Sequence, residues 1–322
     1  MVFIRVLGSF AAEVGGESVP LGGPRQRGVL AMLVAARGQV VPVDRMIEDL
    51  WRGEAPARAL ASLQAYVSNL RRLLEPGRPP RTPARLLVSA APGYALRLPR
   101  EAVDAWRFEQ LLEQARTVAE PGATRALLDD ALALWAGPAF AEVADEPWAL
   151  AETARLDELR SIARELHIAA GLRLSLPVTP DAENLTREQP LREEGWRLYA
   201  LALWSSGRQA DALAALRRAR TTFADELGLD PGPDLVELEE AILTQRTEVL
   251  RGAAAAGPGR PQQPHGAPGP AARRRAAPAT LLAPSISCAS NLLAALVIPA
   301  AVLRRLPAMA ATVETTCSAR GV

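Results

Sequence analysis

The residues best suited to chemistry lie on one side of the segment 58–74. Hydrogen-bonding and cationic side chains recur there at helical spacing, including Ser68, Asn69 and Arg72, with small alanines between them. Asparagine and arginine can form paired hydrogen bonds with adenine and guanine in the major groove, and serine and arginine also bind backbone phosphate. The pattern therefore predicts a helix whose polar side enters a groove of duplex DNA.

Two neighbouring features must position this polar side. The opposite side of the helix carries an apolar stripe made of Leu60, Leu63, Val67, Leu70 and Leu74. Such a stripe predicts packing on a core. Pro76-Gly77 ends the helix, and the apolar runs 86–88 and 94–96 then flank Pro92-Gly93, which predicts a β-hairpin. A helix followed by a hairpin is the element order of a winged helix.

The residues before this helix predict the rest of a small α+β domain. A strand over 2–10 and a return strand over 18–21 are joined by a turn at Gly15-Gly16. Helices are predicted over 24–37 and 44–51, because Pro24 suits a first helical turn and apolar residues follow at helical spacing. A loop over 52–57 then leads into the DNA-reading helix.

After residue 103 the apolar spacing is almost purely helical. A long helix is predicted over 152–176. The pair of helices over 193–206 and 209–226 carries small residues that allow close packing, as in tetratricopeptide-like repeats. Beyond residue 251 the chain is rich in Pro, Ala, Gly and Arg, a composition typical of disorder.

These patterns together predict a mainly α protein with a small α+β part. We expect an N-terminal winged helix-turn-helix over 1–98, followed by a TPR-like all-α helical repeat domain over 103–248. A low-complexity, disordered tail is expected over 251–322.

Charge is distributed unevenly along the chain. All 37 basic residues are arginine, and the net charge is only +1. Residues 1–100 nevertheless carry a net +7, whereas residues 101–250 carry −13. This asymmetry indicates that only the first part meets a polyanion. The absence of lysine also excludes a Walker A phosphate loop and Schiff-base catalysis.

Few residues suggest a metal site, a disulfide or a membrane. The two cysteines, Cys288 and Cys317, lie in the tail without ligand spacing, and His167 and His265 are the only histidines. The apolar run 292–303 is too short for a membrane helix, which needs roughly 20 residues. The first residues lack the apolar core of a signal peptide. We expect a cytoplasmic protein that is not an enzyme and has no metal, cofactor or membrane partner.

Six segments in this order resemble a known family. They are 62–74 (SLQAYVSNLRRLL), 92–94 (PGY), 145–148 (DEPW), 189–193 (QPLRE), 206–213 (SGRQADAL) and 226–233 (ELGLDPGP). Residues 1–98 resemble the OmpR/PhoB-type winged helix, and residues 103–248 resemble the bacterial transcriptional activator domain. Together they are similar to the AfsR/DnrI/RedD (SARP) family of regulators from actinobacteria.

The resemblance implies a transcriptional activator of a secondary-metabolite (antibiotic) gene cluster. Its implied partners are double-stranded DNA with direct repeats, RNA polymerase, and a second copy of the chain on the DNA. The implied DNA contacts are Arg58, Ser62, Gln64, Ser68, Asn69, Arg71, Arg72 and Gly93. The implied polymerase contacts, in the loop before the DNA-reading helix, are Arg52, Gly53 and Glu54. The wing carries Ser89-Ala90-Ala91, without the arginine or threonine common there in relatives.

Two alternatives remain open at this point. The chain could be a helical-repeat adaptor whose winged helix binds protein, although the charge asymmetry favours DNA. It could also be a larger regulator that lost an ATPase domain, because its arginine-rich, acid-poor tail resembles no such domain. Because the winged-helix pattern begins near Phe3, we expect no receiver domain and no direct control by aspartyl phosphate.

Overall fold

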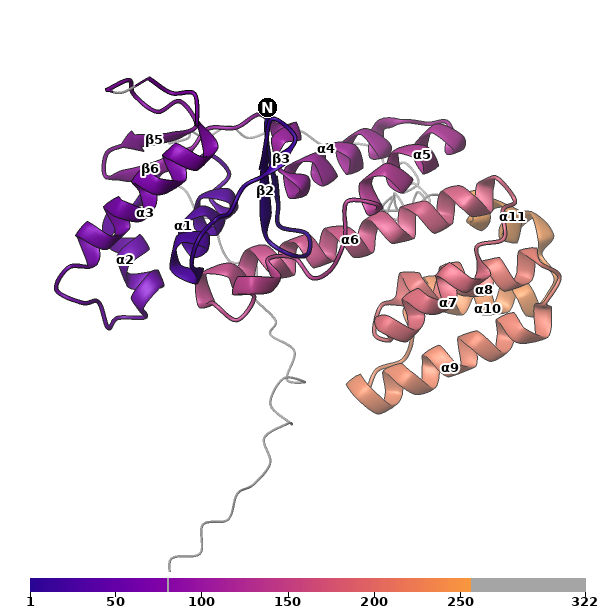
Figure 1. Ribbon diagram of the computed structural model, residues 1–322. Coiled ribbons are helices and arrows are strands. Elements are labelled where there is room, and N and C mark those ends of the chain that lie inside the picture. Colours follow the sequence, from indigo (N-terminus) through magenta and orange to yellow (C-terminus); the bar gives the residue numbers. More distant parts are fainter. Residues whose placement is uncertain (80, 256–322) are drawn as a thin grey trace, which may run out of the picture. The chain divides into compact units, whose positions relative to one another are not determined.

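The computed structural model describes residues 1–79 and 81–255, and it confirms the predicted mainly helical class with a small α+β part (Figure 1). The predicted disordered tail lies outside the described residues, except for its first five. Those five are not disordered as predicted, because they complete helix α11 (Thr247–Ala255).

A three-stranded antiparallel sheet opens the chain. Its strands are β1 (Val2–Arg5), β2 (Ala11–Val14) and β3 (Glu17–Ser18), in the order β1-β2-β3, with Val2 opposite Val14. The prediction of one strand over 2–10 is wrong. Gly8 has a φ of +143°, and the backbone N–H groups of Val6 and Leu7 donate to Asp104 instead of a strand partner. The predicted return over 18–21 is limited to the short β3.

Three helices and a second sheet form the winged helix. The helices are α1 (Pro24–Ala35), α2 (Val43–Trp51) and α3 (Ala59–Leu74). The sheet has the order β4-β6-β5 and consists of β4 (Val41–Pro42), β5 (Leu87–Ala90) and β6 (Gly93–Leu96). Its β5–β6 hairpin is the predicted wing, and α3 is the predicted DNA-reading helix.

The apolar stripe of α3 differs from the prediction at one position. Leu63, Val67, Leu70 and Leu74 are buried as expected, whereas Leu60 is 49% exposed. Ala59 is buried in its place, because the helix begins there and the spacing 59, 63, 67, 70, 74 keeps every member on one side.

The remaining described chain is helical. It comprises α4 (Asp104–Thr117), α5 (Pro121–Leu132), α6 (Pro147–Arg173), α7 (Thr179–Glu188), α8 (Glu193–Ser205), α9 (Gln209–Leu227) and α10 (Pro233–Leu243), with short 3-10 turns at Arg100–Ala102 and Ala141–Val143. The predicted pair of helices after residue 193 corresponds to α8 and α9, which pack against each other.

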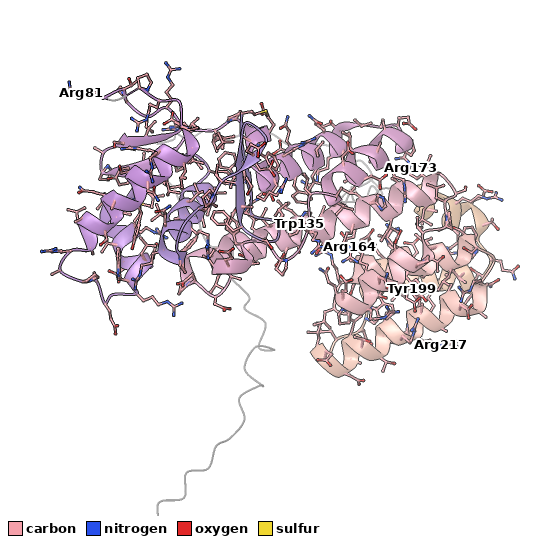
Figure 2. The ribbon with its side chains drawn as sticks, in the orientation of Figure 1. Arg81, Trp135, Arg164, Arg173, Tyr199 and Arg217 are labelled. Carbon is pink, nitrogen blue, oxygen red and sulfur yellow. The ribbon has the colours of Figure 1, made fainter. Side chains whose placement is uncertain are left out.

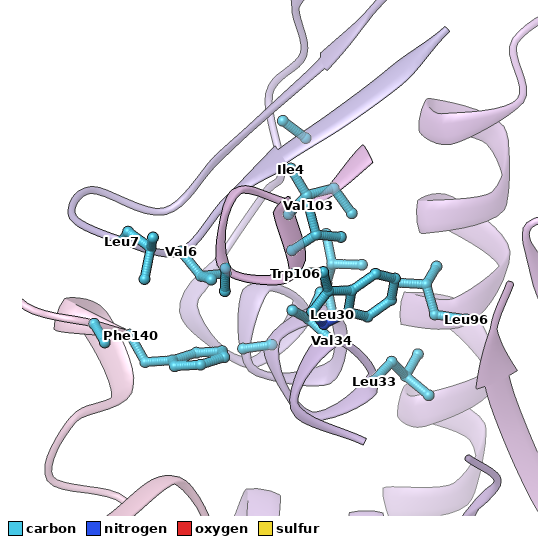
Figure 3. Close-up of a cluster of buried hydrophobic side chains, with 14 of the residues drawn as sticks. Ile4, Val6, Leu7, Leu30, Leu33, Val34, Leu96, Val103, Trp106 and Phe140 are labelled. Carbon is cyan, nitrogen blue, oxygen red and sulfur yellow. The ribbon is translucent and has the colours of Figure 1, made fainter. Parts of the chain in front are cut away.

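Two apolar cores organise the described residues, 1–79 and 81–255. The first is shared by the winged helix, β1 and helices α4–α6. Figure 3 shows Val103 and Trp106 near Ile4 and Leu30, and Phe140 in another part of the same cluster. The second is built from the end of α6 and helices α7–α11. Helix α6 contributes to both cores, with Leu156 and Ala163 in the first and Ile168 and Leu172 in the second. The winged helix therefore completes its core with residues from the helical part.

In the part of the chain that the structure covers, no helix has both the length and the apolar character needed to cross a membrane.

Candidate nucleic-acid interface

Helix α3 presents a polar side whose members differ in exposure. Arg58, which precedes the first turn, is exposed, as are Gln64, Ser68 and Arg72. Ser62, Asn69 and Arg71 are half-buried. The structure thus places six of the eight predicted DNA contacts on α3 and Arg58 directly before it, and it places the eighth, Gly93, in the sheet.

Asn69 is engaged with other protein groups. Its Nδ2 donates to Oε1 of Gln26 at 2.9 Å, and its Oδ1 accepts from Nη2 of Arg72 at 2.7 Å. Gln26 lies on α1, is only 6% exposed, and donates from Nε2 to the Leu21 carbonyl oxygen at 2.8 Å. An uninterrupted chain of hydrogen bonds therefore links the loop before α1 to the exposed arginine of α3.

Gln26 was not among the site residues predicted from the sequence. It stands between Arg25 and Arg27 in the polar first turn of α1, where a polar residue is ordinary and gives no signal of its own. Because its partner Asn69 lies 43 residues away, nothing in the local sequence connects the two side chains.

Arg71 connects α3 to the wing. Its Nε donates to the Leu87 carbonyl oxygen at 2.8 Å, its Nη2 donates to Ser89 Oγ at 2.9 Å, and its guanidinium lies 5.7 Å from the centre of the Tyr94 ring. Burial lowers the pKa of the Arg71 guanidinium from its ordinary value. These contacts give Arg71 a role in holding the hairpin against the helix.

Gly93 is buried at the start of β6, opposite Pro42 of β4. A Cβ at this position would overlap the carbonyl oxygen of Val41. The close approach of the two strands accounts for the glycine. Gly93 is too buried for the DNA contact that we expected of it. Tyr94 is half-buried against the first core.

A second set of arginines lies in the loop between α3 and β5. Glu75 closes this loop, because its Oε1 accepts from the backbone N–H groups of Arg85 and Leu86 at 2.9 and 3.3 Å. Arg78 donates to the Thr82 carbonyl oxygen at 2.5 Å. Arg81 and Arg85 are exposed, and Figure 2 shows Arg81 at the outer edge of the loop.

The loop before α3 begins at a residue that is already paired. Arg52 ends α2 in the left-handed conformation, with a φ of 51°, and its Nη2 lies 2.8 Å from Oε1 of Glu146. Gly53 follows with a φ of 83°, and Glu54 is exposed. Of the three predicted polymerase contacts, Arg52 is therefore tied to the segment just before α6.

The described residues hold no group of three or more His, Cys, Asp or Glu side chains that could bind a metal. His167 pairs instead with Asp129, with 2.6 Å between Nε2 and Oδ1.

Both halves of the described chain match known protein families. Residues 16–96 match the family "Transcriptional regulatory protein, C terminal", and residues 103–243 match "Bacterial transcriptional activator domain". DnrI of Streptomyces peucetius is 34% identical over 248 residues, which cover 74% of this chain and 91% of DnrI.

Longer proteins match over the same region. EmbR of Mycobacterium tuberculosis is 41% identical over 250 residues, which cover 75% of this chain and 63% of EmbR. AfsR of Streptomyces coelicolor is 39% identical over 244 residues, which cover 74% of this chain and 24% of AfsR. The solved structure of M. tuberculosis EmbR with a low-affinity phosphopeptide superimposes with a TM-score of 0.72 at 36% identity, over 79% of this chain and 69% of that one.

Proposed function

The chain belongs to the AfsR/DnrI/RedD (SARP) family of DNA-binding transcriptional regulators, and we propose that it is a sequence-specific activator that binds direct repeats near promoters. Membership follows from the match to nearly the whole of DnrI and from the two family matches. It also places the chain among transcription regulators rather than enzymes.

The observation that carries the proposal is the outward side of α3. Its exposed members are cationic, hydrogen-bonding or small, and residues 1–100 around it carry a net +7. Cationic side chains supply the salt-dependent attraction to phosphate, and polar side chains supply base contacts. In this proposal Arg58, Ser62, Gln64, Ser68 and Arg72 face the major groove, whereas Arg71 acts by holding the wing.

The proposal also includes a second copy of the chain and RNA polymerase as partners, because the family resemblance implies both. Residues 1–98 would bind DNA as a homodimer on two repeats, and residues 103–248 would act on the transcription machinery. The loop that begins at Arg52, Gly53 and Glu54 would contact RNA polymerase. The target genes would belong to a secondary-metabolite cluster.

The proposal is tested by titrating the full-length chain against a promoter fragment with direct repeats in a mobility-shift assay. A specific site should bind about 10³-fold or more tightly than random DNA at physiological salt. Absence of any shift at low salt would overturn the proposal and favour the adaptor function. The outcome is read at several salt concentrations, because affinities to DNA depend steeply on salt.

The homodimer is tested by changing the spacing of the repeats. Two protomers on one face of the duplex require half-sites separated by whole helical turns of about 10.5 base pairs. Insertion of about 5 base pairs, half a turn, should abolish cooperative binding, whereas insertion of a full turn should largely restore it. Equal binding to all three spacings would contradict a dimer on the repeats.

A further inference from the structure

We propose that Gln26 is a specificity-determining positioning residue, which holds Asn69 so that Arg72 reads a guanine at the operator. The inference rests on the proposed binding of DNA by α3. Gln26 itself is too buried to touch DNA, and it acts through the two hydrogen bonds that lead outward to Arg72.

The chain of hydrogen bonds has a fixed direction. At its inner end the Leu21 carbonyl oxygen can only accept, so the amide nitrogen of Gln26 must face it and the amide oxygen must face Asn69. At its outer end the guanidinium of Arg72 can only donate, so the oxygen of Asn69 must face it. Neither amide can be turned over without placing donor against donor or acceptor against acceptor.

This arrangement changes which residue can read a base. Reading adenine requires an N–H and an oxygen lone pair of one asparagine amide together. Asn69 is half-buried, and Gln26 and Arg72 already engage one of its two N–H groups and one lone pair of its oxygen, which fixes the amide and leaves it fewer free groups than Arg72 has. Within the part of the chain that the structure describes, Arg72 donates only one of its five N–H groups, to Asn69, and its side chain is exposed. A guanidinium held by a neighbouring acceptor loses less conformational freedom on binding, and paired hydrogen bonds to guanine are its commonest specific contact.

The inference is tested by selecting preferred sequences from a library of random duplexes with the full-length chain and three variants. Arg72→Ala should lose about tenfold or more of the preference at one G·C pair. Asn69→Ala and Gln26→Leu should weaken the preference several-fold at the same pair. Asn69 is only half-buried, so Asn69→Ala keeps the test valid if circular dichroism shows that Gln26→Leu does not fold.

A double variant distinguishes the positioning of Arg72 by Gln26 and Asn69 from a general loss of structure. In the Arg72→Ala background, Gln26→Leu or Asn69→Ala should cause no further loss of preference. A merely structural role would instead lower affinity equally for selected and random DNA, with or without Arg72, and would overturn the inference. Loss of preference at a different pair in Asn69→Ala would also overturn it. Failure of the wild-type chain to enrich any sequence would instead contradict the proposed function itself.

Discussion

Arginines of the winged helix differ in whether other protein groups already occupy their N–H donors. Arg71 donates to the wing, and Arg52 pairs with Glu146. Within the described residues the Arg58 guanidinium has no hydrogen-bonding or ionic partner, and only its backbone carbonyl is engaged, by the N–H of Ser62. A free guanidinium at the start of a groove-binding helix is well placed for a phosphate contact, which positions the protein without reading sequence.

We therefore expect Arg58→Ala to weaken binding to any duplex by a similar factor. The slope of log affinity against log salt should become shallower by about one, because one fewer counterion is released. Arg208→Ala is the matched control, since Arg208 is an exposed arginine of the helical part paired with Asp211. A loss confined to one operator sequence, with an unchanged salt slope, would show that Arg58 reads a base instead.

Gly93 permits the close pairing of β4 and β6. Gly93→Ala should destabilise the protein by at least about 2 kcal/mol, because the new methyl group overlaps the Val41 carbonyl and the strands must separate. Gly77→Ala is the control, since a Cβ there meets nothing within 4 Å, and it should change stability by no more than about 0.5 kcal/mol. Urea unfolding measures both, and equal stability of the two variants would refute the packing role.

At the scale of elements, Asp104 joins β1 to α4. Its carboxylate accepts from the backbone N–H groups of Val6, Leu7 and Ala105, at 2.7 to 2.9 Å. Asp104 opens α4, where a negative charge interacts favourably with the helix dipole. Burial nevertheless raises the pKa of Asp104 from 3.8 to about 6, since desolvation outweighs the backbone hydrogen bonds.

The raised pKa makes stability depend on pH. Between about pH 4 and 6 the folded protein holds the proton of Asp104 more tightly than the unfolded chain, so its contribution is present at low pH and is lost as pH rises to 6. Relative to Asp104→Asn, the wild type should lose about 3 kcal/mol of unfolding free energy between about pH 3 and 7, about 2 kcal/mol of it between pH 4 and 6. Urea unfolding followed by tryptophan fluorescence tests this, and a difference independent of pH would contradict it.

Features of these elements could be predicted from the sequence where they depend on neighbouring residues, and could not where they depend on residues far apart in the chain. The periodic stripe of α3 and the Pro-Gly turn of the wing are local patterns, and both were found from sequence. Asp104 meets Val6 across 98 residues and Gln26 meets Asn69 across 43, and no periodicity encodes such pairs. The polar side of α3 could therefore be predicted from the sequence. Which of its side chains bind other protein groups, and which are free, could be seen only in the structure.

At the scale of the whole described chain, the DNA-reading helix depends on residues outside the winged helix. Phe108 of α4 is fully buried in the first core, which also holds the apolar stripe of α3, and its ring meets Trp135 edge to face at 5.3 Å. Phe223 of α9 is 2% exposed in the second core, which contains no residue of the winged helix. The same substitution in each core can therefore separate their contributions to DNA binding.

Phe108→Ala and Phe223→Ala should each destabilise their own core by about 3–5 kcal/mol. Only Phe108→Ala should shift the loss of DNA binding to a clearly lower temperature, because only that core supports α3. Fluorescence anisotropy with labelled duplex, measured during heating beside circular dichroism, follows binding and helix content together. If Phe223→Ala lost DNA binding at the same reduced temperature, the two cores would unfold as one cooperative unit, and the helical part would support the recognition helix through its full length.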